Sequence, residues 1–413
     1  METSELVALA ENNLKNAPES LKDFRATHLH FLKNKGLAAK DPEFYRYTNI
    51  EKFFNEFEVK ASTAEVSLNL LTDAHLPTLT FMNGVLTSKV EIPGLVVKSL
   101  KDHFNEVANL FEGDNALTHL HHSLLENGVI LEIEKNTELK SPLRLLNIHT
   151  EGTLVAGAVV IKAARYSKAT ILEENVGQGE TYARLGETYT YVAEGASLEL
   201  VQIDRGAEAA LHHASGVSHL AKDANFRNVV LHLAGKMNRR NVDMKIAEAG
   251  AHGESFNLFL TNQEEHSDLN TAIHHLAADT TSAQIAKGIL DGDSKGIFTG
   301  RIHIHPQAQR VNSSQLNKNL LLSKKAQVHS QPQLEIFADD VKCSHGSTTG
   351  QLSDDEVFYF EARGIPQEKA RTLLAHGFGL EVVLKIQNEA VRKHAEALVM
   401  ETLKTKFKLG GNL

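Results

Sequence analysis

The sequence contains no tryptophan, only 8 prolines and a single cysteine, Cys343. One cysteine cannot form an internal disulfide bond, so a disulfide-stapled fold is excluded. The longest apolar stretch, residues 153–161, is too short to span a bilayer and is followed by Lys162. The N-terminus is acidic and lacks the apolar segment of a secretory signal peptide. These absences predict a protein of the reducing cytoplasm with no membrane segment.

Several functional motifs are also absent from the sequence. It has no G-x-x-x-x-G-K-[ST] phosphate loop, no G-x-S-x-G nucleophile elbow and no H-E-x-x-H zinc helix. We therefore do not expect the chain to hydrolyse nucleotides by itself. The formal net charge of -9 argues against nucleic acid as a main partner, because phosphate binding needs concentrated lysine and arginine.

A repeat runs through the middle of the chain. Six turn-like steps are centred on positions 168, 196, 224, 251, 280 and 308, which are 28, 28, 27, 29 and 28 residues apart. Runs such as 188–192 and 197–201 flank most of these steps, and their period-two alternation is typical of strands. A fixed period of this size predicts a solenoid in which each turn buries its apolar edge against the next. The alternative is an antiparallel sandwich with evenly spaced turns.

Helical patterns precede the repeat. Apolar residues at helical spacing predict two helices between residues 4 and 34, separated at Pro18 and ended at Gly36. The expected fold class is mainly β, a solenoid core with helical regions at both ends. We divide the chain into an N-terminal helical region (1–75), the solenoid core (76–363) and a C-terminal helical region (364–413).

A second helical pattern follows the repeat. Pro366 is placed to start a helix over residues 367–376, which we expect to end near Gly377. From Gly379 to about Phe407 the pattern continues as a helix with an apolar stripe. An apolar stripe on a chain without a phosphate loop suggests a docking surface for another protein.

Several of the 22 histidines occur in pairs: His121–His122, His212–His213, His274–His275, and His303 with His305. His303 and His305 would share one face of a strand, as metal ligands can, but the spacing fixes no third ligand. We expect these pairs to be surface or partly buried structural residues. The acidic runs 339–340 and 354–356 can be interpreted as catalytic carboxylates, but a turn and a helix start are favoured.

Cys343 and His345 lie two residues apart in the most distinctive segment of the sequence, residues 334–350. In an extended backbone the thiol and the imidazole point the same way, and both can bind soft or borderline metals. A metal or cluster site needs about three or four ligands, so this pair cannot complete one. If the pair is functional, the missing ligands come from another chain. The alternative is a buried structural cysteine.

Five segments around this pair carry a specific pattern: 310–317 (RVNSSQLN), 319–323 (NLLLS), 332–336 (PQLEI), 339–346 (DDVKCSHG) and 358–365 (FYFEARGI). Together they resemble the SufB/SufD family of iron–sulfur cluster assembly proteins, and its SufD branch most closely. The resemblance is dense over residues 270–385 and thinner upstream. It implies a right-handed parallel β-helix with helical flanks, in agreement with the repeat. Tyr45 stands where the family has tryptophan, which leaves the role of the N-terminal segment open.

The resemblance also implies partners: a scaffold complex of SufB, SufD and two copies of the ABC-type ATPase SufC. SufB carries more cysteines, so the single Cys343 favours the SufD branch and a non-catalytic scaffold role. His345 is then expected at the SufB–SufD interface, as a ligand shared with the partner for a nascent iron–sulfur cluster, with Cys343 nearby. The isolated chain is expected to hold no cofactor stably, and it can form a homodimer. The expected ATPase-docking residues are Leu373, Leu374, Phe378, Val383 and Leu384.

Two other functions fit the same pattern. The chain can be a SufB-like scaffold that works as a homodimer, and cluster retention by the isolated protein would support that function. A β-helix can also be a carbohydrate-acting enzyme. Such enzymes are usually secreted and need a charged cluster in a groove, and carbohydrate turnover by the isolated chain would support that alternative.

Overall fold

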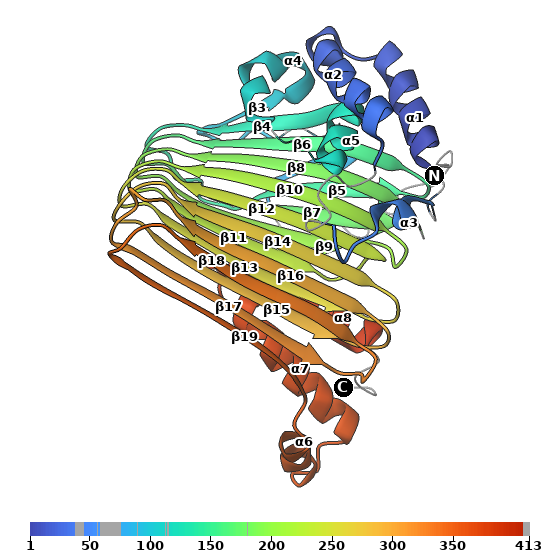
Figure 1. The fold of residues 1–413 in the computed structure, drawn as a ribbon, viewed down its shortest axis with the longest axis vertical. Coiled ribbons are helices and arrows are strands. Elements are labelled where there is room, and N and C mark those ends of the chain that lie inside the picture. Colours follow the sequence, from blue (N-terminus) through green and yellow to red (C-terminus); the bar gives the residue numbers. More distant parts are fainter. Residues whose placement is uncertain are drawn as a thin grey trace.

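The computed structural model of the protein describes residues 1–37, 45–55, 57, 76–88, 90–111, 113, 115–179 and 181–407. A parallel β-solenoid lies between helices from the two parts of the chain that flank it (Figure 1). The predicted fold class is therefore confirmed. The described helices are α1 (Thr3–Lys15), α2 (Glu19–Lys35), α3 (Ile50–Asn55), α4 (Leu100–His103), η2 (Phe104–Glu106), η3 (Ala108–Leu110), α5 (Ala116–Leu124), α6 (Asp354–Glu361), α7 (Gln367–Val383) and α8 (Glu389–Lys406).

The strands form two sheets, A and B, which together make up the solenoid. They are β1 (Thr78–Met82), β2 (Val85–Leu86), β3 (Leu95–Ser99), β4 (Asn127–Ile133), β5 (Leu143–Thr150), β6 (Leu154–Ala163), β7 (Lys168–Gln178), β8 (Ala183–Val192), β9 (Ser197–Arg205), β10 (Leu211–Leu220), β11 (Asn225–His232), β12 (Met237–Ile246), β13 (His252–Thr261), β14 (His266–His275), β15 (Thr281–Leu290), β16 (Lys295–Ile304), β17 (Val311–Leu321), β18 (Gln327–Ile336) and β19 (Val341–Gln351). Sheet A has the order β19-β17-β15-β13-β11-β9-β7-β5-β1-β2, and sheet B has the order β18-β16-β14-β12-β10-β8-β6-β4-β3. Consecutive strands from β4 onward therefore lie in opposite sheets, so each turn contributes one strand to each.

The strand pairing is parallel throughout the repeat, as in β9 with β11 and β10 with β12. Antiparallel pairs join β1 to β2, around the turn at Asn83 and Gly84, and β3 to β4. A solenoid brings strands of successive turns together in parallel, whereas a sandwich of hairpins would pair neighbouring strands in antiparallel. The pairing therefore excludes the antiparallel sandwich.

The register of sheet A shows the repeat directly. Successive turns align Lys168, Ser197, Asn225, His252, Thr281, Asn312 and Lys342. The predicted period near 28 residues holds as far as Thr281, and the next two intervals lengthen to 31 and 30. The longer interval arises at residues 305–310 between β16 and β17, where the turn holds more residues than its counterpart at 193–196. The sequence predicted that the sixth turn-like step, at position 308, follows the fifth after 28 residues like the earlier steps. This prediction is wrong, because the aligned residues are 31 apart.

The corner that leads from sheet B to sheet A has a recurrent backbone form. In successive turns one residue of this corner has a positive φ: Asn136, Tyr166, Gly195, Asp223, Gly250, Asp279 and Arg310. A fully buried small residue follows in several turns, including Ala196, Ala224 and Ala251. Ala196 and Ala224 occupy equivalent places, as predicted, and the Asn225 amide donates to the carbonyl oxygen of Ala196 at 2.8 Å. The corners are therefore packed parts of the core.

The first helices of the chain cover the outer face of sheet B. Helices α1 and α2 are separated at Pro18, and α2 ends at Gly36 with φ 62°, both as predicted. Together with α5 they bury a cluster that includes Leu6, Leu29 and Leu120 against Leu185 and Leu211 of sheet B. The proposed boundary at residues 75 and 76 borders a part of the chain that lies outside the described residues.

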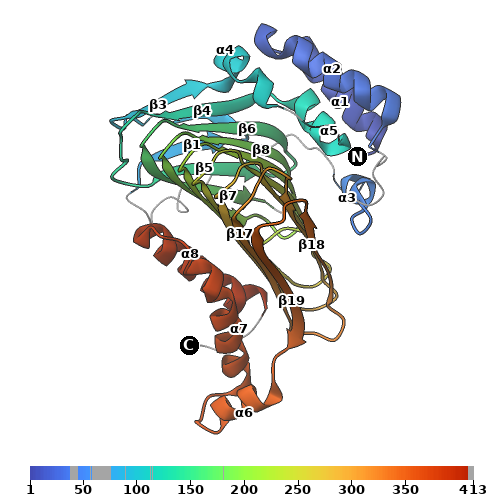
Figure 2. The same ribbon diagram turned by 60° about the vertical axis from the view of Figure 1, so that its left-hand side comes forward.

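The last helices cover the outer face of sheet A, as Figure 2 shows for α7 and α8. Helix α7 continues through Gly377 and Gly379 to Val383, so the predicted helix end near Gly377 is wrong. At Gly379 a Cβ atom would lie 3.4 Å from Leu258 and 3.6 Å from Ile289. These are ordinary van der Waals distances, so an alanine would fit here, and nothing in the structure explains a glycine inside the helix.

The apolar stripe of α8 lies against the chain's own sheet. Val391, Ala395, Val399 and Leu403 are fully buried in a cluster with residues of sheet A. A helix periodicity shows which face is apolar and leaves open what covers that face. The interpretation of this stripe as a docking surface for another protein is therefore wrong.

Candidate functional site

The solenoid is open at the end formed by its last turn. Strands β18 and β19 are the outermost strands of sheets B and A, and each pairs with only one described strand. Their residues are mostly exposed or half-buried. An outer strand presents unpaired backbone N–H and C=O groups, which can pair with a strand of another chain. The last turn therefore offers two adjacent edges to a partner.

Cys343 and His345 both lie on β19 at this open end. In the register, Cys343 follows Ser313 of β17, and His345 follows Gln315. Ser313 and Gln315 are fully buried between the sheets, so the alternation of the strand directs Cys343 and His345 to the same inner face. His345 is nevertheless exposed, because no further described turn covers it. The predicted common direction of the thiol and the imidazole is thus consistent with the strand register.

A column of interior polar residues leads to His345. Its register positions in successive turns are Leu200, Asn228, Ser255, Gln284, Gln315 and His345. The column changes from apolar to polar at Asn228 and stays buried through Gln315. The Gln315 Nε2 atom donates to Gln284 Oε1 at 2.7 Å. His345 is therefore the accessible last member of a hydrogen-bonding interior column, which the repeat spacing alone did not reveal.

Cys343 is half-buried beside an apolar cluster. The cluster contains Ile302, Ile304 and Val311, with Val341 and Cys343 packed at its edge. Burial raises the pKa of the Cys343 thiol, although a hydrogen bond from the Ser313 backbone partly opposes the shift. The thiolate is the form that attacks or binds metal, so Cys343 is a protonated thiol at neutral pH. Its reactivity therefore depends on a change in its surroundings.

Two serines face each other across the open end. Ser330 of β18 lies 2.8 Å from Ser347 of β19, measured between the Oγ atoms, and donates to Asn317 Oδ1 at 2.7 Å. These hydroxyl groups extend the polar lining beyond His345. The sequence analysis missed these serines. A single serine belongs to no recognisable spacing pattern, and the contact between Ser330 and Ser347 joins strands of different sheets.

Exposed apolar side chains lie where β18 ends. Ile336 is 40% exposed and Phe337 is 59% exposed. The Phe337 ring lies 5.3 Å from the ring of His303, centroid to centroid, and His303 lies 4.3 Å from His305. His303 and His305 thus lie close together, although the described residues provide no set of three metal-ligand groups there. The acidic residues 339–340 form a bend, and 354–356 begin α6, as predicted.

The predicted ATPase-docking residues have different surroundings. Leu373, Leu374 and Phe378 of α7 are half-buried, and Leu384 is 59% exposed just after the helix. Val383 is fully buried against sheet A and cannot contact a partner without moving α7. Val383 is therefore unsuited to the docking role expected for it, because the apolar periodicity that selected it reflects packing on the chain's own sheet.

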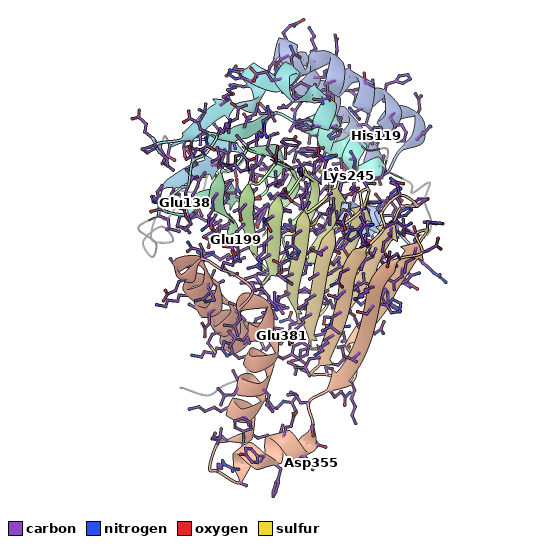
Figure 3. The ribbon with its side chains drawn as sticks, turned by 90° about the vertical axis from the view of Figure 1, so that its left-hand side faces the viewer. His119, Glu138, Glu199, Lys245, Asp355 and Glu381 are labelled. Atoms are coloured by element: carbon purple, nitrogen blue, oxygen red, sulfur yellow. The ribbon has the colours of Figure 1, made fainter. Side chains whose placement is uncertain are left out.

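Helix α6 carries the most exposed aromatic residues at this part of the molecule. Phe358 is 68% exposed and Tyr359 is 54% exposed. The Arg363 guanidinium stacks 3.6 Å from the Tyr359 ring centroid. Figure 3 shows α6, labelled at Asp355, projecting away from the sheets beyond α7, labelled at Glu381. In the sequence, residues 358–365 contributed to the family resemblance. Their pattern did not show that Phe358 and Tyr359 form an exposed surface.

Helix α7 is fixed to the solenoid by a buried cation. Lys287 of β15 pairs with Glu381, and its Nζ atom donates to the carbonyl oxygen of Phe378 at 2.9 Å. Burial lowers the pKa of Lys287, although the contact with Glu381 acts in the opposite direction. These contacts hold the α7–α6 projection in a defined orientation. No helix in the described part of the chain has the length and apolar character needed to cross a membrane.

Residues 146–378, more than half of the chain, match a family described as "SUF system FeS cluster assembly, SufBD core domain". The chain belongs to the SufBD family. This SufBD protein is thus an iron–sulfur cluster assembly protein, and the resemblance seen in the sequence is confirmed. SufBD-family proteins are scaffold components of this assembly system.

Relatives of this SufBD protein cover most of its length. SufD of Escherichia coli is 28% identical over 395 residues, which cover 91% of this chain and 92% of the relative. A SufBD family protein of Synechocystis is 27% identical over 414 residues, covering 92% and 91%. SufD of Bacillus subtilis is 25% identical over 348 residues, covering 81% and 78%. The similarity thus extends beyond the matched core domain.

Proposed function

We propose that this SufBD protein is a non-catalytic SufD-like scaffold subunit that pairs with a SufB-like chain and docks a SufC-like ATPase. The observation that carries the proposal is the open end of the solenoid, where His345 and Cys343 lie beside two unpaired strand edges. The absence of a phosphate loop is consistent with an ATPase on a separate chain.

Strand addition is the proposed mode of pairing with the SufB-like chain. The free edges of β18 and β19 can each accept a strand of the partner, and backbone hydrogen bonds then supply affinity. Ile336 and Phe337 would lose their exposed apolar surface on pairing. The carbohydrate-enzyme alternative has no support from family membership, and a homodimer through the same edges stays a testable alternative.

The proposed role of His345 is to ligate a nascent iron–sulfur cluster, which is the cargo of the assembly. An imidazole can replace a thiolate on iron, so His345 can share a cluster with cysteines of the partner. Cys343 is the proposed second contributor. Its thiol would have to lose a proton first, because burial raises its pKa.

The first experiment is co-purification of the chain with candidate SufB-like and SufC-like partners, followed by iron analysis and an absorbance spectrum of the complex. We expect His345→Ala to preserve the complex and to reduce its cluster content, because an exposed imidazole contributes little to folding. Lys342→Ala, an exposed change on the same strand, is the matched control. Normal cluster content in His345→Ala would remove His345 from the site. Cluster retention by the chain alone would favour the SufB-like homodimer.

The second experiment tests docking of the ATPase. Deleting α7 and α8 would uncover the apolar face of sheet A, so substitutions of exposed residues are the better test. We expect Phe358→Asp combined with Leu384→Asp to abolish ATPase co-purification and to leave pairing with the SufB-like chain intact. Anchor residues at interfaces commonly contribute about 2 kcal/mol or more each. Tyr191→Asp, at a similarly exposed aromatic residue on β8, is the control, and unchanged ATPase binding by the double variant would place docking elsewhere.

A further inference from the structure

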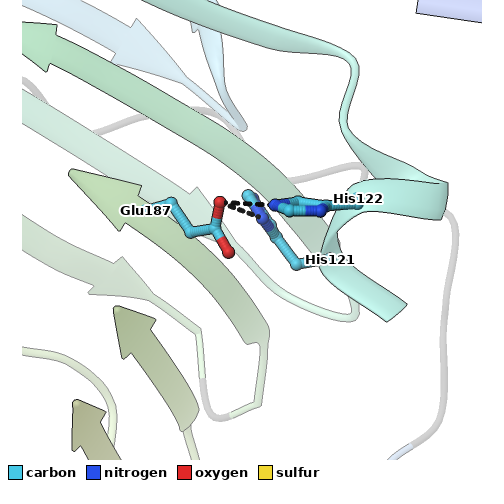
Figure 4. Close-up of side chains that lie close together, drawn as sticks. All are labelled: His121, His122 and Glu187. Atoms are coloured by element: carbon cyan, nitrogen blue, oxygen red, sulfur yellow. Dashed lines mark hydrogen bonds and ion pairs between the residues drawn. The ribbon is translucent and has the colours of Figure 1, made fainter. Parts of the chain in front are cut away.

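Two consecutive histidines of α5 converge on one glutamate of sheet B. Helix α5 begins after Asn115, whose side chain accepts a hydrogen bond from the Thr118 amide at 3.0 Å. Figure 4 shows His121 and His122 of α5 both directed at Glu187 of β8. All three side chains are buried, with at most 4% exposure. The sequence prediction of surface or partly buried histidines is therefore wrong for this pair.

The ligand atoms of the three residues lie together. His122 Nε2 is 2.8 Å from Glu187 Oε2, and His121 Nδ1 is 3.2 Å from the same oxygen. The chosen ligand atoms of all three residues lie within 4.8 Å of one another. Tyr189 donates a hydrogen bond from its hydroxyl to Glu187 Oε2 at 2.7 Å. The carboxylate is therefore held in place by its neighbours.

The tautomer of His121 is set by the backbone. His121 Nε2 lies 3.1 Å from the carbonyl oxygen of Gly157. A carbonyl oxygen only accepts, so the proton of a neutral His121 must be on Nε2. His121 Nδ1 then presents a lone pair to the Glu187 carboxylate, and it has no hydrogen-bond partner among the described residues. Two acceptors that face each other in a buried site are stabilised by a cation between them, which is either a proton or a metal ion.

His122 is oriented in a similar way. Its Nδ1 atom lies 3.3 Å from Nε2 of His28 on α2. When His28 Nε2 accepts the His122 Nδ1–H, Nε2 of His122 is left with a lone pair directed at Glu187 and can bind a cation. Metal-binding histidines commonly donate their other ring N–H to such an outer partner.

Aromatic rings lie beside the three side chains. The Phe24 and Phe111 rings lie 4.9 and 5.8 Å from the His122 ring, centroid to centroid. With the ring protons on the atoms that face Gly157 and His28, the Glu187 carboxylate and one ring nitrogen of each histidine face one another.

We propose that His121 Nδ1, His122 Nε2 and the Glu187 carboxylate bind a divalent transition-metal ion of the zinc type. Two imidazoles and one carboxylate form a known zinc ligand set that leaves a fourth position open. The nitrogen and oxygen ligands disfavour magnesium and calcium, which prefer oxygen alone. The bound ion would join α5 to β8, and so would fix the N-terminal helices to sheet B. This site is on a different face of the solenoid from the open end and does not depend on the proposed scaffold function.

The test uses the full chain without a purification tag. After treatment with a chelator and removal of the chelator, the protein is incubated with Zn²⁺, and bound metal is measured by mass spectrometry. Co²⁺ provides a visible absorbance spectrum that reports the ligand geometry. We expect about one metal ion per chain, with loss of binding in His122→Ala and in Glu187→Gln. His28→Ala removes the outer partner and should weaken the metal affinity about 10–100-fold.

A double substitution, His303→Ala with His305→Ala, is the matched control, because it removes two neighbouring histidines at the end of β16. It should leave metal binding unchanged. Failure of the wild-type chain to take up a stoichiometric ion would overturn the proposal, and an imidazolium–carboxylate pair would then explain the cluster. Retention of the metal by both His122→Ala and Glu187→Gln would also overturn it. If a variant does not fold, two measurements on the wild-type chain still test the proposal: the number of metal ions bound per chain and the Co²⁺ absorbance spectrum.

Discussion

Glu174 provides a quantitative test of how the C-terminal helices are anchored. This residue of β7 is fully buried. Arg144 donates to it from Nε at 2.9 Å, Arg205 Nε lies 2.8 Å away, and His394 of α8 lies 3.3 Å away. Burial acts against the charge, but the contacts with His394 and the two arginines outweigh it and lower the pKa of Glu174 to about 2. One carboxylate thus connects three strands with α8.

The lowered pKa of Glu174 determines the direction and the size of the pH dependence of folding stability. A carboxylate with a pKa of about 4.5 in the unfolded chain and about 2 in the folded chain contributes about 3 kcal/mol of stability at neutral pH. This contribution is complete above the unfolded pKa and declines as the pH falls from about 4.5 toward 2. By pH 3 the folded state should have lost about 2 kcal/mol from this residue alone.

The assay compares urea unfolding midpoints of wild type and Glu174→Gln between pH 7 and pH 3. At pH 7 we expect the variant to be less stable by about 3–5 kcal/mol, because two arginines lose a buried partner. The difference between the two proteins should shrink as the pH falls. Glu401→Gln, at an exposed carboxylate on α8, is the control. A constant difference across the whole pH range would refute the assigned charge of Glu174.

Three further substitutions test separate parts of the structure. Ala224→Leu should lower the free energy of unfolding by about 1–3 kcal/mol through overpacking of a corner, whereas Lys222→Leu at an exposed neighbouring position should change it by less than about 0.5 kcal/mol; equal midpoints in urea would contradict the packed corner. Cys343→Ser should lower the cluster content of the assembled complex less than His345→Ala does, as measured by iron analysis, and a larger loss would make the thiol the main ligand. Asn388→Ala should cost about 1 kcal/mol by removing the cap of α8, which thermal unfolding can measure.

The repeat could be predicted from the sequence because the corners that lead from sheet B to sheet A have similar local requirements. In several turns a left-handed residue is followed by a small buried one, as Ala196 and Ala224 show. The lengthened turn at 305–310 was missed because extra residues in a turn leave the alternation of the strands unchanged. Ala308 resembles the earlier corner alanines in sequence, yet Asn312, rather than a residue 28 positions on, aligns with Thr281.

Contacts between distant segments were beyond the sequence patterns. Consecutive histidines on a helix lie about 100° apart, and nothing in their spacing shows that both reach a glutamate 65 residues away. The apolar stripe of α8 was correctly placed, but the sequence could not show that sheet A covers Val391 and Leu403. The pair Cys343 and His345 was found because both lie on one strand, where period-two alternation alone fixes their direction.

The two ends of the solenoid differ, and this difference limits how large an assembly can grow. The last turn ends in the free edges of β18 and β19, whereas the first end finishes in short antiparallel strands, with α4 packed near β3 and β4. When two chains pair through their open ends, the edges of β18 and β19 in both chains become hydrogen-bonded. These are the only long free strand edges in the described part of the fold. Oligomerisation would then stop at the dimer, because a filament needs a second interface on every subunit. Pairing through these edges, as proposed, would therefore give a closed assembly of two chains.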